Sequence, residues 1–516
     1  TVMNLDKFRI KSLYKNNNGD LWIGTNGGGL YKYIPREDVF TQYLYDPGDP
    51  WSISNNGIVS IKEDSAGILW IGTLGGGVNR IDPYKNIFDY FVHNTYNSNS
   101  LSHNYIIPIF EDRDGILWIG TGGGGLNRYD KKNKTFFCYK HDPEDQNSLP
   151  NNYIRAICED RSDFLWIATE DGGVSRIKKN DWQNGKFENF RNKNSDPESL
   201  NSDHVVTLHV DKDNVLWAGT ERGLNRFIRG KDKFARYEFP LSKSRMKNVW
   251  TIYEDSLGVL WIGSWGHGFA HFNKKDKTVV HYSYEPGSSN GISHDIITSF
   301  FEDKNKILWI GTYGGGLNRL NRAKGEFKYY TKKDGLPDNI IYGILGDKNN
   351  HLWLSTSNGL SRFDPEKESF FNYFKSDGLQ GNDFNRAAYF KDKNGKMYFG
   401  GPNGMNVFSP ENIRVNKNIP PVVITSFRVF NKEKLLDLNQ ASRTGIILNY
   451  DENYFSFEFA ALDFVSAEQN RYAYLLIGVD KDWVHSGTRR YAGYSNISPG
   501  KYIFKVKGSN NDGIWN

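Results

Sequence analysis

Adjacent carboxylates are the first residues of this sequence whose type and spacing could do chemistry. A pair of Asp and Glu side chains can supply the general acid and the general base of a hydrolase or lyase. Here the pair recurs, at Glu63–Asp64, Glu111–Asp112, Glu159–Asp160, Glu254–Asp255 and Glu302–Asp303. Because an active site is singular, repetition excludes a catalytic role and predicts turn residues where strands end.

Aromatic and polar residues that interrupt a glycine-rich pattern form the second group. Most copies of one short segment read like TGGGGL, but one copy reads SWGHGF, with Trp265 and His267, and another carries Tyr313. Two more copies carry Glu170–Asp171 and Glu221–Arg222. Similar departures stand shortly before or early in the strand that opens each unit: Tyr105, Tyr153, Arg155, His204, Trp250, His294, Tyr342, Asn382, Asp383 and Arg386.

These departures predict a binding surface. In a four-stranded blade, the loop after the second strand and the loop before the first strand open on the same face. The residues would therefore ring one mouth with flat aromatic faces and forked donors, the mixture that an oligosaccharide-binding surface needs. The ligand-binding candidates are Trp265, His267, Tyr313, Arg155, His204, Trp250, His294, Tyr342 and Arg386.

An enzyme is the alternative function. His204, His267, His294 and Tyr342 could hold the base and acid of a polysaccharide lyase or hydrolase at the same mouth. Strings such as DRDG and DKDN lack the length and the terminal glutamate of an EF-hand loop. We predict no catalytic residue, no metal site and no cofactor.

The elements that must position these residues come from an internal repeat. Its marker is a tryptophan, replaced by tyrosine in the ninth copy, and successive copies are 44 to 51 residues apart: Trp22, Trp70, Trp118, Trp166, Trp217, Trp261, Trp309, Trp353 and Tyr398. This period is typical of propeller blades. Within a unit, GIVSIKED, ILWIGT, VNRID and IFDYFVH read as four short strands with glycine and polar turns between them. The tryptophans are predicted to pack in the core.

The count of units favours a seven-bladed ring. After the ninth unit's third strand, GMNVFSP, no aromatic fourth strand follows, whereas IFDYFVH (87–93) is an outer strand without a blade. We therefore predict that these two strands pair. The expected organisation is all-β: the last two blades of an earlier, truncated propeller (1–86), a seven-bladed β-propeller (87–415) and a sandwich (420–516). The alternative is one ring of eight or nine blades.

The sandwich is predicted because the sequence pattern changes after the propeller repeats. PPVVITSFRVF, NYFSFEFAAL, RYAYLLIGVD and GKYIFKVKGSN are strands at the spacing of an immunoglobulin-like fold. Residues 416–421 read as a short, stiff linker, and the sandwich reads as C-terminally truncated.

Composition narrows the choice of partners. The net charge of +5, from 65 basic and 60 acidic residues spread through every unit, gives no nucleic-acid footprint. No apolar run approaches the ~20 residues of a membrane span. Cys138 and Cys158 read as thiols with no disulfide between them. Because the chain starts at Thr1, inside a repeat, we expect a fragment of a longer protein.

The sequence also resembles a known family. SLSHNYIIPIFEDRDGILWIGTGGGGLNRYD resembles the propeller repeat of bacterial hybrid two-component regulators. The C-terminal part, from PPVVITSFRVFNK to DGIWN, is similar to the tyrosine-rich Y_Y_Y domain that follows such propellers, with Tyr472, Tyr474, Tyr491 and Tyr502 as its tyrosines. The resemblance covers the whole chain.

The resemblance implies a sensor. The chain would be the extracytoplasmic or periplasmic part of a regulator anchored in a membrane by segments absent here, and it would not itself be an enzyme. It would detect an oligosaccharide from polysaccharide breakdown and pass the signal to a histidine kinase elsewhere in the full-length protein. The sandwich would support self-association, because kinase signalling brings two chains together.

Overall fold

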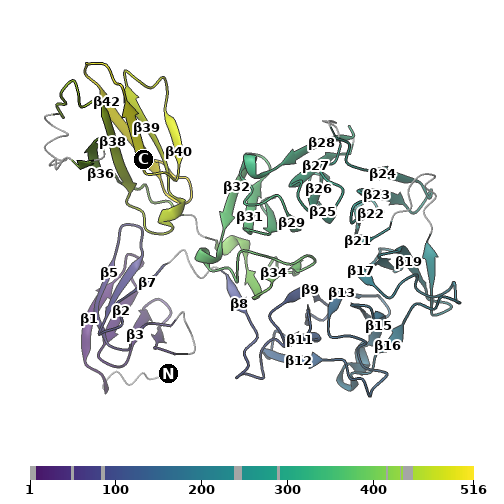
Figure 1. The fold of residues 1–516 in the computed structure, drawn as a ribbon. Coiled ribbons are helices and arrows are strands. Elements are labelled where there is room, and N and C mark those ends of the chain that lie inside the picture. The colour runs from purple at the N-terminus through teal and green to yellow at the C-terminus, as the bar shows by residue number, and fades with distance from the viewer. Residues whose placement is uncertain are drawn as a thin grey trace. The chain divides into compact units, whose positions relative to one another are not determined.

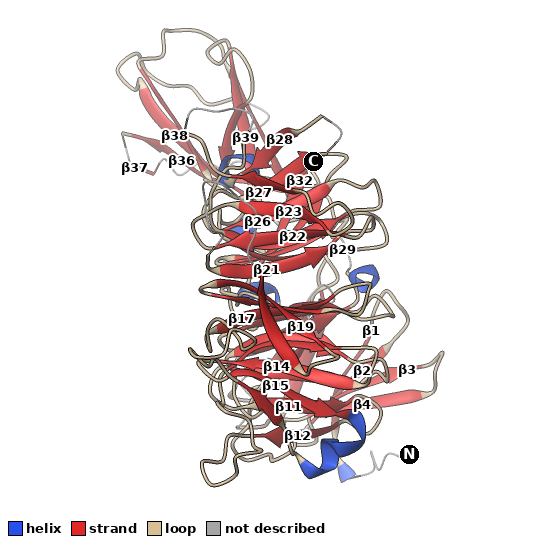
Figure 2. Ribbon diagram, turned by 90° about the vertical axis from the view of Figure 1, so that its right-hand side faces the viewer, coloured by secondary structure: helices blue, strands red, loops and turns tan. Residues whose placement is uncertain are grey.

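The computed structural model describes residues 7–47, 52–82, 88–237, 247–286, 291–322, 324–413, 416–430, 432–433 and 445–516. These residues form many short strands joined by turns (Figure 2). Their helices are short 3-10 turns: η2 (Lys179–Asn184), η3 (Lys332–Asp334), η4 (Lys375–Asp377), η5 (Pro410–Asn412) and η6 (Ala467–Gln469). None of the described helices has the length and apolar character that crossing a bilayer requires.

The chain folds as two compact units, and each is described by itself: Ile87–Asn412 is one, and Thr1–Asn86 with Ile413–Asn516 is the other. The first unit is a ring (Figure 1). Six of its four-stranded antiparallel sheets use consecutive strands, which confirms the repeat. They are β9 (Ile106–Glu111), β10 (Leu117–Thr121), β11 (Leu126–Asp130) and β12 (Thr135–Tyr139); β13 (Ile154–Glu159), β14 (Phe164–Thr169), β15 (Gly173–Lys178) and β16 (Glu188–Phe190); β17 (Val205–Val210), β18 (Leu216–Thr220), β19 (Gly223–Ile228) and β20 (Lys233–Tyr237); β21 (Val249–Glu254), β22 (Val259–Ser264), β23 (Phe269–Asn273) and β24 (Val279–Tyr282); β25 (Ile297–Glu302), β26 (Leu308–Thr312), β27 (Leu317–Asn321) and β28 (Glu326–Tyr330); and β29 (Ile341–Gly346), β30 (Leu352–Thr356), β31 (Gly359–Asp364) and β32 (Ser369–Tyr373).

The seventh blade closes the ring in the predicted way. It consists of β33 (Tyr389–Lys391), β34 (Met397–Gly401), β35 (Gly404–Phe408) and the early strand β8 (Asp89–Phe91). Met405 pairs with Phe91 and Val407 with Asp89, so a strand from before the ring completes its last blade (Figure 1). Blades are numbered one to seven below, from β9–β12 to this closing blade. The junction assigned at residues 86 and 87 lies outside the described residues.

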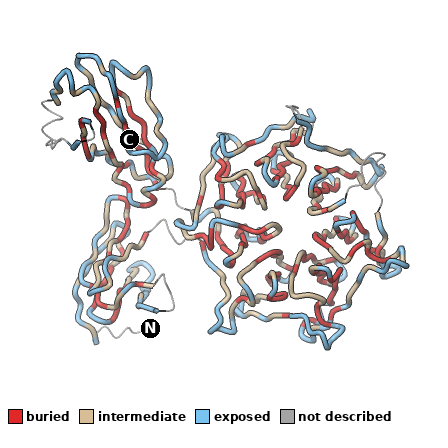
Figure 3. Tube along the Cα trace, viewed as in Figure 1, coloured by how far each residue is buried: buried red, intermediate tan, exposed pale blue. Residues whose placement is uncertain are grey.

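Contacts between blades explain the WIGT segment. The glycine in this segment sits where the next blade approaches: a Cβ on Gly120 would lie 2.6 Å from Ile154, and one on Gly263 would lie 2.8 Å from Ile297. Larger residues would force the blades apart. The marker tryptophans Trp118, Trp166 and Trp353 are fully buried, and exposed residues follow the outer rim (Figure 3).

The acidic pairs are structural, as their repetition predicts. Asp112 accepts backbone N–H bonds from Asp114 and Ile116, and its second oxygen accepts the indole N–H of Trp118 at 2.7 Å. The glutamate of the pair reaches the preceding blade, as when Glu159 accepts from the Arg113 backbone. Basic side chains add ion pairs between blades, including Arg229 to Asp160, Lys274 to Asp211 and Arg322 to Asp255. In blades one to six the aspartate of the turn thus accepts a hydrogen bond from the marker tryptophan.

The second unit begins with two repeats. One is a four-stranded sheet, β1 (Ile10–Lys15), β2 (Leu21–Thr25), β3 (Leu30–Ile34) and β4 (Val39–Tyr43), and the other has the three strands β5 (Ile58–Glu63), β6 (Leu69–Thr73) and β7 (Val78–Ile81). In the order of the sequence, β8 would be the fourth strand of the second repeat. In the structure β8 pairs with β35 of the ring instead.

The same unit contains the predicted sandwich. One sheet holds β36 (Val422–Val429), β37 (Lys432–Glu433), β38 (Tyr454–Ala461) and β41 (Tyr491–Ser495), and the other holds β39 (Arg471–Ile477), β40 (Val484–Gly487) and β42 (Ile503–Ser509). Its core is aromatic, with Phe457 stacked on Phe504 at 3.9 Å between ring centroids.

The predicted linker is part of the sandwich rather than a free connection. The Asn416 side chain is fully buried and its amide donates to both oxygens of the buried Asp463, while Asn510 donates to the carbonyls of Asn416 and Asn418. The sandwich also touches the second repeat: Trp70 meets the edge of Phe464, and Arg80 donates to the Phe464 carbonyl.

Candidate functional site

The first strands of blades two to six share an irregularity near their starts. In blades two to six the first strand shifts register by one residue just after its start, so one residue stands unpaired opposite the second strand: Arg155, Val206, Trp250, Thr298 and Tyr342. These first strands lie innermost in the ring (Figure 1). A bulge re-aims its side chain, and three of the five bulge residues were among the predicted ligand-binding residues.

Blades four to six supply a continuous run of aromatic rings, which we call the aromatic arc. Trp250 and Trp265 lie 4.0 Å apart between centroids, Trp265 and Tyr313 lie 5.2 Å apart, and Tyr313 and Tyr342 lie 6.4 Å apart. Tyr313 is 36% exposed and Trp265 is half-buried. Single bridges from Trp265 and Tyr313 to the loop before the next blade hold the two rings on one face.

Blades one to three supply a polar counterpart. Tyr105 and Tyr153 lie 6.4 Å apart between centroids, and the Arg155 guanidinium lies 4.7 Å from the Tyr153 ring. Arg155 is ion-paired with Glu170, and Nδ1 of His204 is 3.0 Å from Asp171 and 3.7 Å from Glu170. The polar half is therefore a network of internally paired charges.

Arg386, from the loop before β33, crosses from blade seven to blade four. Its guanidinium lies 4.0 Å from the Trp250 ring centroid, and it donates to the Trp250 carbonyl at 3.1 Å. Burial, together with the nearby positive charge of Arg155, lowers the pKa of Arg386 to about 10. At neutral pH the group stays charged, in the space between the aromatic arc and the polar half.

Asp383 and Tyr342 adjoin each other at the end of the aromatic arc. Burial raises the pKa of Asp383, and a hydrogen bond from Tyr342 opposes part of that rise. Burial, followed by the charge of Asp383, raises the pKa of the Tyr342 hydroxyl. The charge of the same carboxylate also contributes to a raised pKa at Tyr105, after burial and Tyr153.

Two predicted residues are not brought into this arrangement. His294 accepts the backbone N–H of Ile296 at 3.1 Å, the turn role that His103 plays for Tyr105. The His267 backbone contacts Ser264 and the outer-strand residue His281. The catalytic alternative is thereby weakened, because His204, His267 and His294 stand in different settings.

Sequence reasoning found most members of the mouth but not which of them meet. The bulge register carries a signal that it missed: in blades two to six the residue directly after the buried first residue of the opening strand stands outside the strand pairing. Tyr105, Tyr153 and Asp383 were seen as departures from the repeat, yet nothing local shows that they adjoin Arg155, Arg386 or Tyr342.

Among the described residues, one cluster has the spacing of potential metal ligands. Ligand atoms of Glu170, Asp171 and His204 lie within 4.8 Å of one another. The ion pair between Arg155 and Glu170 competes with a cation for that carboxylate, so the chemistry of the donor set does not favour a metal.

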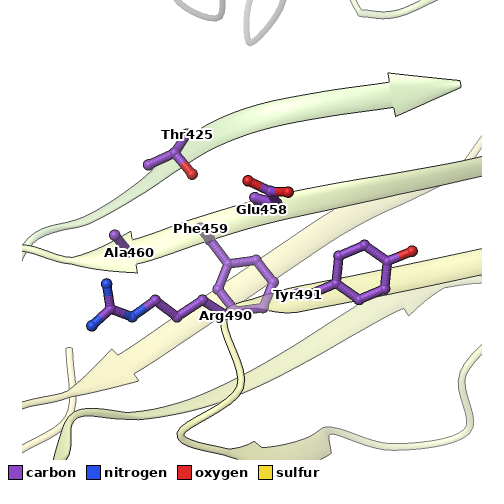
Figure 4. Close-up of a pocket in the computed structure, with 6 residues that line it drawn as sticks. All are labelled: Thr425, Glu458, Phe459, Ala460, Arg490 and Tyr491. Atoms are coloured by element: carbon purple, nitrogen blue, oxygen red, sulfur yellow. The ribbon is translucent and has the colours of Figure 1, made fainter. Parts of the chain in front are cut away.

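A hollow of about 370 Å³ lies on the sandwich (Figure 4). Thr425, Glu458, Phe459, Ala460, Arg490 and Tyr491 line it. Arg490 is tied to the Ala467 carbonyl and Glu458 to Arg428. Because its polar groups are partnered and it has no aromatic run, it is a weaker candidate than the ring mouth.

Comparisons with known proteins agree with this architecture. The family described as "Two component regulator propeller" matches seven segments, and the Y_Y_Y domain matches residues 463–516; the propeller segments are 52–75, 100–123, 148–171, 199–222, 245–266, 291–314 and 335–358.

Solved structures and a curated relative extend the likeness. The extracellular domain of a putative hybrid two-component system from B. thetaiotaomicron is 26% identical, with a TM-score of 0.73, over 98% of this chain and 71% of that one. A putative one-component system from the same organism shares the fold, at 24% identity and a TM-score of 0.52, over 98% of this chain and 68% of that one. Histidine kinase P4 from Formosa agariphila is 30% identical over 333 residues, 60% of this chain. The chain spans 24% of that relative's length.

Fold and repeats together define an all-β protein that joins a propeller to a sandwich. The chain is extracytoplasmic, and it joins two-component regulator propeller repeats to a Y_Y_Y domain.

Proposed function

We propose that this chain is the ligand-sensing region of a membrane-anchored two-component sensor and that the ring mouth binds an oligosaccharide. The signal that the mouth is occupied is then transmitted to a histidine kinase in the full-length protein. The observation that carries the proposal is the aromatic arc, four neighbouring rings on one face of the propeller.

The chemistry of sugars suits this surface. A pyranose ring presents a flat face of C–H groups that packs on aromatic rings, while its hydroxyls need donors and acceptors at the edge. Trp250, Trp265 and Tyr313 supply the first kind of contact, and Arg155, Glu170 and Asp383 supply the second. A partly exposed aromatic run also has a cost in solubility that a binding role explains.

Calorimetry with a panel of neutral and acidic oligosaccharides tests the proposal. The panel is cello-, xylo- and agaro-oligosaccharides with oligogalacturonides and carrageenan oligosaccharides. Trp265→Ala should weaken binding by about 1–3 kcal/mol, which is roughly 5- to 150-fold. Tyr329→Ala is the matched control, because Tyr329 is an exposed aromatic on the outer strand β28. Binding by no member of the panel, or equal loss in both variants, would refute a sugar site at the mouth.

The same panel separates the sensor from the lyase or hydrolase. A sensor gives stoichiometric heat and leaves each oligosaccharide intact, as product analysis over time would show. Accumulating shorter or unsaturated products would establish the enzyme instead.

Transmission through the sandwich completes the proposal. Asn416 and Asn418 are held within the sandwich by hydrogen bonds to Asp463, so the start of the sandwich is an ordered part of that domain. We propose that ligand binding changes how two sandwiches associate, a rigid-body switch that needs only about 1–3 kcal/mol of coupling. Sedimentation of a longer protein that reaches the membrane boundary, with and without ligand, tests this. An association constant that saturating ligand leaves unchanged contradicts it.

A further inference from the structure

We propose that the ring mouth selects oligosaccharides that carry negative charge and that Arg386 receives the anionic group. The group would be a uronate carboxylate or a sulfate ester. This inference rests on the oligosaccharide function proposed above and adds the chemical class of the ligand.

The first support is the incomplete pairing of Arg386. A guanidinium has five N–H donors in a fixed fork. One of them donates to the Trp250 carbonyl, and one face of the group covers the Trp250 ring. Among the residues that the structure describes, no carboxylate lies within ion-pair distance of Arg386. A half-buried cation without a counterion is costly, and an anionic ligand would remove that cost.

The second support is the way the neighbouring charges are already used. Glu170 is ion-paired with Arg155, and Asp171 lies against His204. Glu170 is thus already paired with Arg155 and does not form an ion pair with Arg386. The positive charge of Arg386 therefore stays available to a ligand. Arg155 acts on Arg386 more strongly than Glu170 does, and it further lowers the pKa of Arg386.

The third support is that Asp383 gives the ligand a direction. It adjoins Tyr342, at the end of the aromatic arc opposite Trp250. An anionic group would be repelled from that end and drawn to the Trp250 end, where Arg386 lies. A sugar ring stacked on the aromatic arc can then place its carboxylate or sulfate against the free side of the guanidinium, which favours two parallel hydrogen bonds.

Matched probes test the inference on the unaltered protein. Oligogalacturonides are compared with the same oligomers as methyl esters, and sulfated carrageenan oligosaccharides with their desulfated forms. We expect the charged form of at least one pair to bind at least about 10-fold more tightly, the usual scale of a hydrogen bond to a charged group. The pair that shows the difference tells a carboxylate ligand from a sulfate ligand. Tight binding of neutral forms, equal to that of the charged forms, overturns the inference and leaves the proposed function standing. No binding by any oligosaccharide overturns both.

Substitution then locates the effect. Arg386→Gln should lose about 10-fold or more of the affinity for the charged form and change the neutral form little. Arg161→Gln is the control, because Arg161 is an exposed arginine in the turn between β13 and β14, at the opposite end of these strands from the mouth loops. Equal losses in both variants would indicate general surface attraction and would overturn the role of Arg386. If Arg386→Gln does not fold, the comparison of acid and ester on the unaltered protein still decides whether charge is selected.

Discussion

The ring and the second N-terminal repeat share one sequence pattern but are buried to different extents. Leu126 in the ring is 0% exposed, whereas Val78 at the same position of the second N-terminal repeat is 69% exposed. Trp118 is likewise fully buried, while its counterpart Trp70 is half-buried and meets Phe464. A repeat of this kind makes a sheet by itself, but its core is completed only by a neighbour.

The largest expected effect comes from the marker tryptophans. Trp118→Ala should destabilise the ring by about 3–5 kcal/mol, because it empties a fully buried site. Trp70→Ala should cost its own repeat about half as much or less, because that side chain is already partly in water. Hydrogen exchange resolved by peptide measures the two regions separately. Equal costs would show that the exposed repeat depends on its tryptophan as the ring does.

A pH effect is expected in the ring, at His209. Burial lowers the pKa of His209 to about 4, against the smaller opposing effects of Glu254 and Asp211, with Lys274 acting in the same direction as burial. The unfolded chain therefore takes up the proton first, so ring stability should fall as pH drops from about 6.5 to about 4, by at most on the order of 2–3 kcal/mol.

His209→Phe is the variant that checks this origin. Phe110 and Phe301 face the tryptophans of blades one and five as His209 faces Trp217. The variant should unfold with a shallower pH dependence between about 6.5 and 4. If urea titrations give the same slope for both proteins, another group is responsible.

The turn that binds the indole gives an intermediate effect. Asp112→Asn sets an amide N–H against the Trp118 indole N–H and should cost about 1–3 kcal/mol. The first N-terminal repeat has Asn16 at this position, and the indole nitrogen of Trp22 is buried without a partner among the described residues. Asn16→Asp should therefore slow hydrogen exchange around Trp22. Faster exchange there would contradict the idea that the carboxylate is what the N-terminal repeat lacks.

The smallest effect on stability is expected at the mouth. Trp265→Ala should change the melting temperature little, by the equivalent of about 1 kcal/mol, since the side chain is half-buried on a loop and its neighbours Trp250 and Tyr313 can still contact solvent. Calorimetric melting measures this. A loss as large as that of Trp118→Ala would make Trp265 a core residue and would remove it from the site.

The sequence by itself determined the strands, the repeat and the closing of the ring. Alternating and apolar runs, glycine turns and the spacing of Trp118 and its equivalents are local patterns, and within the ring nearly every strand pairs with the next strand in the chain. The one distant pairing, of β8 with β35, could be inferred because both strands were left over in the count. The aromatic and polar departures predicted a binding mouth, and that prediction is the basis of the function proposed above.

Only the tertiary structure decided which members of that set meet. Arg386 reaches Trp250 across 136 residues of sequence, a contact that depends on how seven blades curve around one centre. Periodicity says nothing about that curvature, nor about the turn that uses the His294 side chain or the half-exposure of Trp70. These features depend on which other segments pack against a residue once the chain has folded. The position of a residue within the repeat does not determine them.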